Sequence, residues 1–136
     1  MSAVLVDTGP IVAILDRSDD AHARCVAAWK KLERPPLTVW PVLTEALYLL
    51  AFSSAAQAEV LGWIDTGAVL LAPLDRGDAS RIRELMLKYR DLPMDFADAA
   101  LVRVAEREKV RRVFTLDRRD FGVYRPSRLG RFAIMP

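Results

Sequence analysis

The sequence predicts an α/β protein, built as a three-layer α/β/α sandwich around a mostly parallel central sheet. Three observations lead to this prediction. Short apolar runs alternate along the chain with longer segments of helical spacing, which is the pattern of parallel strands joined by crossover helices. The length of 136 residues suits one domain. No linker, repeat or low-complexity segment divides the chain, so we expect a single domain over residues 1–136.

The first half of the chain carries two predicted strands and four predicted helices. The apolar run at 3–6 predicts a buried strand, and the turn after it leads into a helix through Ile14 and Leu15, with Pro10 in its first turn. Residues 18–33 open with capping residues and continue with helical spacing, and the two prolines that follow end this helix. The remaining elements of this half are a strand at 37–40 and helices at 41–52 and 53–67.

The second half continues the same alternation. An apolar run predicts a third strand at 68–74, and an amphipathic helix follows at 75–91, with its apolar residues on one face. We expect a further helix at 95–109 and a strand at 111–117. The last six residues, RFAIMP, predict an edge strand.

Composition excludes several classes of protein. Hydrophobic residues make up 52% of the chain, which is too many for a disordered protein. No apolar run approaches the roughly 20 residues that a membrane-spanning helix needs, and the N-terminus lacks the pattern of a secretory signal. The single Cys25 and single His22 exclude an internal disulfide and a zinc site of the usual kind. We therefore expect a cytoplasmic protein without a membrane partner.

The charge is unevenly distributed along the chain. Residues 1–100 carry 10 Lys and Arg against 14 Asp and Glu, whereas residues 101–136 carry 10 against 4. The basic C-terminal part indicates a polyanionic partner, and a solvated basic face is the alternative. If the partner is a polyanion, we expect all or some of four arginines of this part to line the approach to the acidic residues: Arg112, Arg118, Arg119 and Arg125.

Acidic side chains occur where two strands end and on apolar helix faces. Asp7 and Asp117 follow predicted strands, and the carboxyl ends of parallel strands meet at one edge of a sheet, where ligands bind. Glu45 and Asp98 have mainly apolar neighbours three and four residues away in predicted helices. Asp95 lies one turn before Asp98, at the helix N-terminus, where the helix dipole favours a carboxylate.

Each acid also has a purely structural explanation. Asp7, Asp95 and Asp117 could cap helices or turns, and Glu45 could pair with a distant Arg. Together, however, carboxylates from four segments could not crowd at one edge without a counter-charge, because an unpaired buried charge is very costly. Mg²⁺ and Mn²⁺ prefer oxygen ligands and would resolve this repulsion. Such an ion beside a basic surface suits phosphodiester hydrolysis.

Four segments of the chain resemble PIN-domain ribonucleases, and more narrowly the VapC-type toxins of toxin–antitoxin pairs. These segments are VLVDTGPIVAILD at the start, LTEALYLL in the middle, and LPMDFADAALVRVAE and VFTLDRRDF near the end. No single motif among them is specific, but their order and spacing fit over the length of the chain. The resemblance implies a PIN-like fold and a metal-dependent endoribonuclease that acts as a toxin.

The resemblance also implies roles for particular residues. The catalytic acids are Asp7, Glu45, Asp98 and Asp117. Asp7 and Asp98 are the expected direct ligands of Mg²⁺ or Mn²⁺, with the other acids bound directly or through water. Asp95 resembles an accessory acid of part of the family. Supporting roles are expected for Thr8, Thr115 and Asp120, and a structural role for Asp120 is the alternative.

The same resemblance implies two protein partners, a second copy of the chain and a cognate antitoxin. The sequence adds an unusual amount of apolar surface on the helices at 41–52 and 53–66, which favours a homodimer. The residues concerned are Leu47, Leu49, Leu50, Phe52, Val60, Leu61, Trp63 and Ile64. The alternative is that both helices are simply core. An antitoxin is expected to inhibit by placing a side chain such as Arg at the carboxylates.

Other functions fit less well. A PIN-like binding module without activity, or an RNA-processing nuclease that is no toxin, keeps the fold but changes the role. A phosphatase of the haloacid dehalogenase kind would need a second Asp at the position of Gly9. A dinucleotide-binding protein would need a Gly-rich fingerprint, which the chain lacks. The three tryptophans, Trp29, Trp40 and Trp63, are expected to pack in the core.

Overall fold

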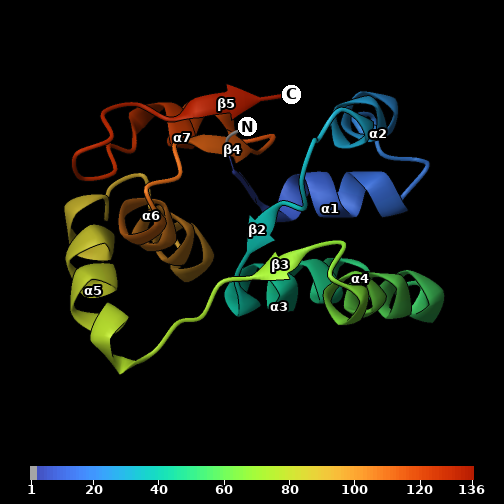
Figure 1. Ribbon diagram of the computed structural model, residues 1–136, viewed down its shortest axis with the longest axis horizontal. Helices are drawn as coiled ribbons and strands as arrows, with labels where there is room; N and C mark the ends of the chain where they lie inside the picture. Colours follow the sequence, from blue (N-terminus) through green and yellow to red (C-terminus); the bar gives the residue numbers. More distant parts are fainter. Residues whose placement is uncertain (1–2) are drawn as a thin grey trace.

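Five short parallel strands form the centre of the molecule, in a computed structural model that describes residues 3–136 (Figure 1). The strand order is β3-β2-β1-β4-β5, and every pairing is parallel, which confirms the predicted sheet. β1 lies in the middle, with Leu5 opposite Leu37 on one side and Val113 on the other. The strands are β1 (Val4–Val6), β2 (Leu37–Thr38), β3 (Leu70–Leu71), β4 (Arg112–Phe114) and β5 (Ala133–Met135).

Helices connect consecutive strands and cover both sides of the sheet. In the view of Figure 1, α5 and α6 lie to the left of the strands and α1 and α2 to the right. α3 contacts both α1 and α6, so it joins the two helical layers. The helices are α1 (Thr8–Leu15), α2 (His22–Lys30), α3 (Trp40–Leu49), α4 (Ser54–Thr66), the 3-10 turn η1 (Arg76–Asp78), α5 (Ala79–Lys88), α6 (Phe96–Glu108) and α7 (Arg118–Val123).

Side-chain hydrogen bonds explain where the first two helices begin. α1 begins at Thr8, so Pro10 lies in its first turn as predicted, and the Asp7 carboxylate accepts the Thr8 N–H and caps the helix. α2 begins later than predicted, because Asp16 and Asp19 accept backbone N–H groups two residues ahead and fold the preceding segment into turns. Local hydrogen bonds thus determine where α1 and α2 begin.

The segment after β4 differs most from the prediction. The strand expected at 111–117 ends at Phe114, and the six-residue helix α7 was not predicted. The Asp117 carboxylate accepts the Asp120 N–H at 3.0 Å and caps α7. A helix this short has too few residues to show an apolar period, so only its cap could have indicated it.

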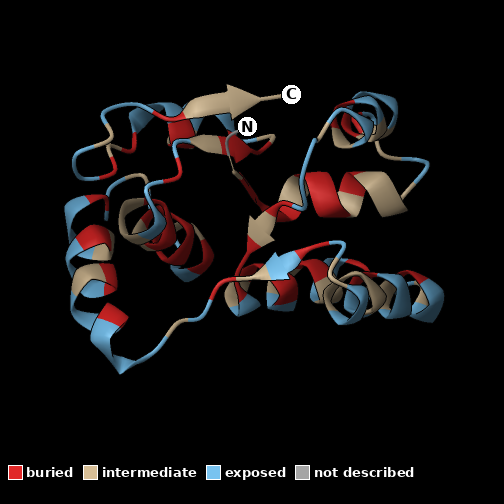
Figure 2. Ribbon diagram, viewed as in Figure 1, coloured by how far each residue is buried: buried red, intermediate tan, exposed pale blue. Residues whose placement is uncertain are grey.

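The helix α6 is the centre of the core. Seven of its residues are buried, including Leu101 and Val102, and Figure 2 shows it in red beside the strands. Because α6 packs on both α3 and α5, the N-terminal turn that carries Asp98 is fixed by the surrounding core. Within residues 3–136, no helix has the length and apolar character required to cross a bilayer.

The prediction for the tryptophans is confirmed in two of three cases. Trp29 and Trp63 pack on each other with ring centroids 5.0 Å apart, and both lie against the core. Trp40 is 54% exposed, contrary to the prediction, because it opens α3 on the side that faces solvent.

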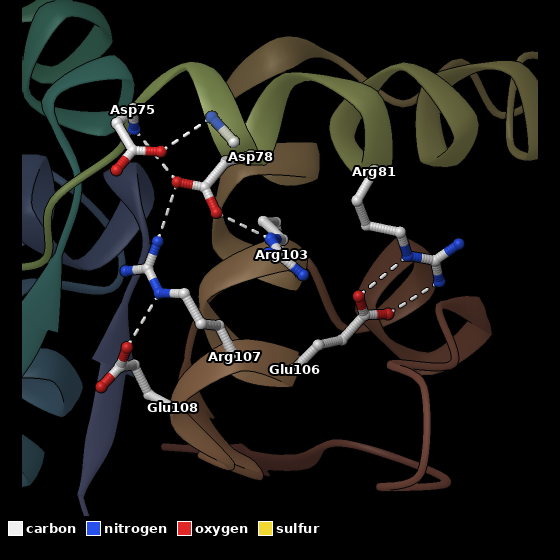
Figure 3. A network of polar contacts seen from close by, with 8 residues as sticks. Asp75, Asp78, Arg81, Arg103, Glu106, Arg107 and Glu108 are labelled. Carbon is white, nitrogen blue, oxygen red and sulfur yellow. Dashed lines mark hydrogen bonds and ion pairs between the residues drawn. The ribbon is translucent and has the colours of Figure 1, made fainter.

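A polar network fastens η1 and α5 to α6 (Figure 3). Asp78 is only 3% exposed and accepts hydrogen bonds from Arg103 Nε at 2.8 Å and Arg107 Nη1 at 2.9 Å. Burial alone would raise the pKa of Asp78, but hydrogen bonds from the Asp75 N–H and both arginines outweigh it and hold the pKa below its ordinary value. Farther along, Arg81 makes two hydrogen bonds to Glu106, at 2.9 and 2.8 Å.

We predict that Asp78→Asn lowers the free energy of unfolding by about 2 kcal/mol, because it leaves two partly buried guanidinium groups without their carboxylate. Since the folded-state pKa of Asp78 is lowered, its contribution is complete at neutral pH and is lost as the pH falls through that pKa. Urea denaturation measures the change. The matched control is Glu84→Gln, at an exposed pair with Arg81, which should cost about 0.5 kcal/mol or less. Equal losses in the two variants would contradict this assignment.

Candidate active site

An open pocket lies where the central strands end, and carboxylates dominate its wall. Asp7 follows β1, and Asp117 follows β4 three residues after its last residue. No Lys or Arg lines the pocket, as far as residues 3–136 show. The lining residues are Asp7, Thr8, Gly9, Glu45, Pro93, Asp95, Asp98, Leu116, Asp117 and Asp120. The structure therefore brings all four acids of the predicted catalytic set together, with two further acids beside them.

The turn at Gly9 lets α1 approach the segment after β4. A Cβ atom at Gly9 would lie 3.3 Å from Leu116 Cβ, which is closer than ordinary van der Waals contact. The absence of a side chain there keeps the Asp7 end of α1 next to the segment that leads to Asp117.

Asp7 is buried, and both of its oxygens are occupied by hydrogen bonds. Oδ1 accepts the Thr8 N–H at 2.8 Å, and Oδ2 accepts the Thr115 hydroxyl at 2.7 Å. Burial raises the pKa of Asp7 even though both hydrogen bonds favour the charged form. The Thr115 hydroxyl in turn accepts the Asp117 N–H at 3.0 Å. Thr115 thus links two of the acids, whereas the Thr8 hydroxyl lies 3.5 Å from the Val42 carbonyl oxygen.

Asp98 faces the pocket from the first turn of α6. Its Oδ2 accepts the hydroxyl of Tyr124 at 2.8 Å, and its N–H donates to Asp95 Oδ1 at 2.8 Å. Asp95 is therefore the N-cap of α6 as well as part of the pocket wall. Burial raises the pKa of Asp98 to about 8, and the charge of Asp7 adds to this. Burial and the Asp98 charge also raise the pKa of Tyr124, so its hydroxyl remains a donor.

Three of the acids lie close enough to share one cation. Asp98, Asp117 and Asp120 each offer a carboxylate oxygen within 4.8 Å of the other two. Asp120, for which a structural role was the alternative, lies in this group. Asp7, which was also expected as a direct ligand, lies outside this group. Each of its oxygens accepts one hydrogen bond, from the Thr8 N–H or the Thr115 hydroxyl. A set of carboxylate oxygens at this spacing fits a hard divalent cation such as Mg²⁺ or Mn²⁺.

Glu45 reaches the pocket from α3, beyond the three-acid group. The residues one turn before and after Glu45 in α3 are the buried Val42 and the highly exposed Tyr48. Glu45 therefore lies at the border of the core. Burial raises the pKa of Glu45, and the negative charges of Asp95 and Asp7 raise it further. Burial and the charge of Asp117 likewise raise the pKa of Asp120. The pKa values of several carboxyls are therefore raised, first by burial and then by the charges of the neighbouring acids.

The four predicted RNA-binding arginines lie in different places. Arg119 is exposed in the first turn of α7, where its charge acts on Asp120. Arg118 is exposed and donates to the Pro136 carbonyl oxygen. Arg125 donates to three carbonyl groups at the end of α7, so it serves as a helix cap. Arg112 opens β4, at the end of the strand away from the acids, and lines a different pocket.

Tyr124 is a functional candidate that the sequence did not reveal. It is fully buried and lies 26 residues after Asp98, to which it donates its hydroxyl proton. An aromatic residue near the end of a chain is most simply explained as core packing, and Tyr124 does pack on Tyr89 and Phe121. Its distance from Asp98 along the sequence left no local pattern to connect the two.

Comparisons with known proteins agree on the kind of protein to which this site belongs. The model of the PIN domain matches residues 4–125. Ribonuclease VapC26 of Mycobacterium tuberculosis is 34% identical over 136 residues, which is 98% of this chain and 100% of that protein. Two crystal structures share the fold. The first is Mycobacterium tuberculosis VapC20, a toxin that cleaves the sarcin–ricin loop. Its TM-score is 0.76 at 18% sequence identity, and the match covers 82% of this chain and 87% of the VapC20 chain. The second is VapBC2 from Rickettsia felis, bound to a promoter DNA fragment. Its TM-score is 0.65 at 12% sequence identity, and the match covers 98% of this chain and 99% of the matched chain.

We predict that the metal-free protein loses stability as the pH rises from about 6 to about 8. In the unfolded chain Asp98 is ionised over this range, whereas in the folded protein it stays protonated until the pH approaches about 8. The folded state therefore binds one more proton, and the free energy of unfolding should fall by at most about 1.4 kcal/mol per pH unit. Urea denaturation in EDTA at several pH values measures this slope.

The control for the pH slope is Asp98→Asn, which removes the contribution of Asp98 and should make the slope clearly smaller than in the wild type. A wild-type protein whose stability is constant or rises over the same range would contradict the raised pKa of Asp98.

Proposed function

This chain belongs to the PIN-domain family and is a VapC-type endoribonuclease, and we propose that it cuts RNA with the aid of Mg²⁺ or Mn²⁺ held in the acid pocket. The observation that carries the proposal is the convergence of acids from four segments in a pocket whose described lining contains no Lys or Arg. Such a cluster is unfavourable without a cation and fits one well.

The proposed ligands follow from the geometry of the pocket. Asp98 is an expected direct ligand of the ion and belongs to the three-acid group, so we assign it direct contact with the ion. Asp117 and Asp120 complete the group, since their oxygens lie within 4.8 Å of Asp98 and of each other. Asp7, Glu45 and Asp95 line the same pocket and are proposed to bind the ion directly or through ordered water.

The acids also determine how RNA can approach. A pocket lined by six carboxyl side chains repels phosphate groups, so a cation is needed for substrate access as well as for reaction. When bound, a divalent cation lowers the pKa of a water molecule and stabilises the charge that develops on the phosphate. The chain's own residues hold the acids in place: Thr115 keeps Asp7 and the Asp117 backbone together, and Asp95 fixes the first turn of α6.

The basic side chains nearest the acids are proposed to hold the RNA backbone. Arg119 and Arg118 are exposed at the start of α7, directly after Asp117. We expect Arg119→Glu to weaken RNA binding and to reduce its salt slope by about 1. Arg112→Glu, at the other end of β4, should change the slope much less. RNA binding is measured at several salt concentrations. Equal salt slopes for both variants would show that Arg119 belongs to a solvated basic face and does not contact RNA.

We further propose that the chain is the toxin of a toxin–antitoxin pair and acts in the cytoplasm. Its likeness to the toxin VapC20 and to VapBC2 supports this role. An antitoxin could inhibit by placing an Arg at the carboxylates, because a guanidinium group pairs strongly with a carboxylate in two-point hydrogen bonds. It would thereby supply the positive charge that the pocket lacks.

An exposed apolar groove beside the acid pocket supports a homodimer. Trp40, Tyr48 and Phe96 line it and are 54%, 79% and 52% exposed, and it shares Glu45 and Asp95 with the acid pocket. Of the apolar residues predicted for an interface, Leu49, Phe52 and Leu61 are exposed, whereas Leu50 and Val60 are core. Pairing of two copies across this groove would set two acid pockets side by side.

Sedimentation at micromolar concentration tests the dimer. The wild-type protein should sediment as twice the 15.3 kDa chain mass, and Tyr48→Glu should give the monomer because it places a charge in the apolar groove. The matched control is Val123→Ser, which changes an exposed apolar residue on α7 and should leave the dimer intact. A wild-type monomer would exclude this assembly.

We predict that Asp98→Asn reduces RNA cleavage by about 100-fold or more, because the amide keeps the size of the side chain but removes the charge that binds the cation. The fold should persist, as judged by circular dichroism, since an amide oxygen can still accept the Tyr124 hydrogen bond. EDTA should abolish wild-type cleavage, and added Mn²⁺ should restore it.

The control for this experiment is Asp65→Asn, at an exposed acid on α4, purified in the same way to exclude contaminating nuclease. It should cleave RNA as the wild-type protein does. If Asp98→Asn were as active as this control, the proposed site would be wrong; if the wild-type protein were inactive with every divalent cation, the chain would be a binding module.

A further inference from the structure

The helix α7 and the residue that follows it connect three of the groups around the acid pocket. Asp117 caps its N-terminus, Asp120 lies in its first turn, and Tyr124 is the residue at its C-terminal end. Two of these groups belong to the three-acid group, and the third donates a hydrogen bond to the remaining member, Asp98, on α6. The 2.8 Å bond from Tyr124 to Asp98 is therefore a direct link between the two helices that carry the three acids.

We propose that Tyr124 is a positioning residue that fixes the Asp98 carboxylate in the orientation that binds the divalent cation. This inference rests on the metal site of the proposed function and assigns to it a residue outside the acidic set. Tyr124 touches neither substrate nor ion in this proposal; it acts through Asp98.

The position of the Tyr124 hydroxyl is itself tightly determined. The side chain is fully buried, and its ring packs edge-on against Tyr89 and Phe121, with centroids 5.1 Å away in both cases. Phe121 packs in turn on Phe132, which extends the aromatic cluster toward β5. The Tyr89 hydroxyl has another partner, since it accepts the Arg125 N–H at 2.9 Å. A ring enclosed in this way cannot move its hydroxyl to another partner without repacking.

A fixed hydrogen-bond donor matters for Asp98 because the neighbouring acids repel its carboxylate. The charges of Asp7, Asp95 and Asp117 repel an ionised Asp98, and in the absence of a restraint its carboxylate would rotate away from them. The Tyr124 hydroxyl holds Oδ2, which leaves the other oxygen of the same carboxylate to face a ligand. Partners that orient a metal-binding side chain in this way typically contribute about 10- to 100-fold to metal affinity.

The test is Tyr124→Phe, which keeps the aromatic ring and removes only the hydroxyl. The matched control is Tyr89→Phe, which removes a hydroxyl from the same buried cluster but no contact with an acid. For both variants and the wild type, calorimetry gives the dissociation constant of Mn²⁺, urea denaturation gives the stability, and cleavage assays give kcat as a function of Mn²⁺ concentration. The Mn²⁺ constant of Asp98→Asn shows whether the measured binding belongs to the pocket.

We expect Tyr124→Phe to raise the Mn²⁺ dissociation constant about tenfold or more. The Mn²⁺ concentration for half-maximal cleavage should rise in parallel, and kcat should recover at saturating Mn²⁺. Tyr89→Phe should keep the wild-type Mn²⁺ constant even if it is less stable. An unchanged Mn²⁺ constant in Tyr124→Phe, or an equal rise in Tyr89→Phe, would overturn the inference while leaving the proposed function in place. If Asp98→Asn had the wild-type dissociation constant for Mn²⁺, the proposed metal site would be wrong, and this inference would be wrong as well.

Discussion

Repulsion between like charges is the constraint on which the rest of this structure depends. Six carboxyl side chains meet at one edge of the sheet, and the pocket that they line has no cationic side chain within residues 3–136. The fold holds them there with neutral donors: backbone N–H groups at helix N-termini, the Thr115 hydroxyl on Asp7, and the Tyr124 hydroxyl on Asp98. These donors fix the acids but do not cancel their charge. The remaining negative potential is what a divalent cation would neutralise.

The scaffold behind the pocket is built to resist that repulsion. α6 is buried along most of its length, so Asp98 projects from a helix that cannot shift without disturbing the core. On its far side, Asp78 and Glu106 pair with arginines and fasten α5 to α6 (Figure 3). β1 and β4 pair directly, which sets the Asp7 and Asp117 ends of the two segments side by side. Stability is thus concentrated in the elements that present the acids.

Much of this arrangement could be predicted from the sequence, and what could not has identifiable physical causes. The alternation of apolar runs and amphipathic segments predicted the parallel sheet, and the placement of Asp7 and Asp117 after strands predicted a shared edge. Asp120 and Tyr124 gained their positions from α7, a helix too short to show periodicity. Arg112 was grouped with the other arginines because charge alone does not show which end of a strand a side chain occupies. The sequence places Trp40 in a predicted strand at 37–40, whereas it is the first residue of α3 and lies exposed in the groove beside the acids.

The central claim is that acids from separate segments form one divalent cation site at the carboxyl edge of the sheet. The most direct measurement is a crystal structure of the protein soaked in Mn²⁺, with anomalous scattering recorded for manganese. The account predicts a peak within coordinating distance of the Asp98, Asp117 and Asp120 oxygens. A fully ordered pocket without a peak, or manganese bound only elsewhere on the surface, would contradict it.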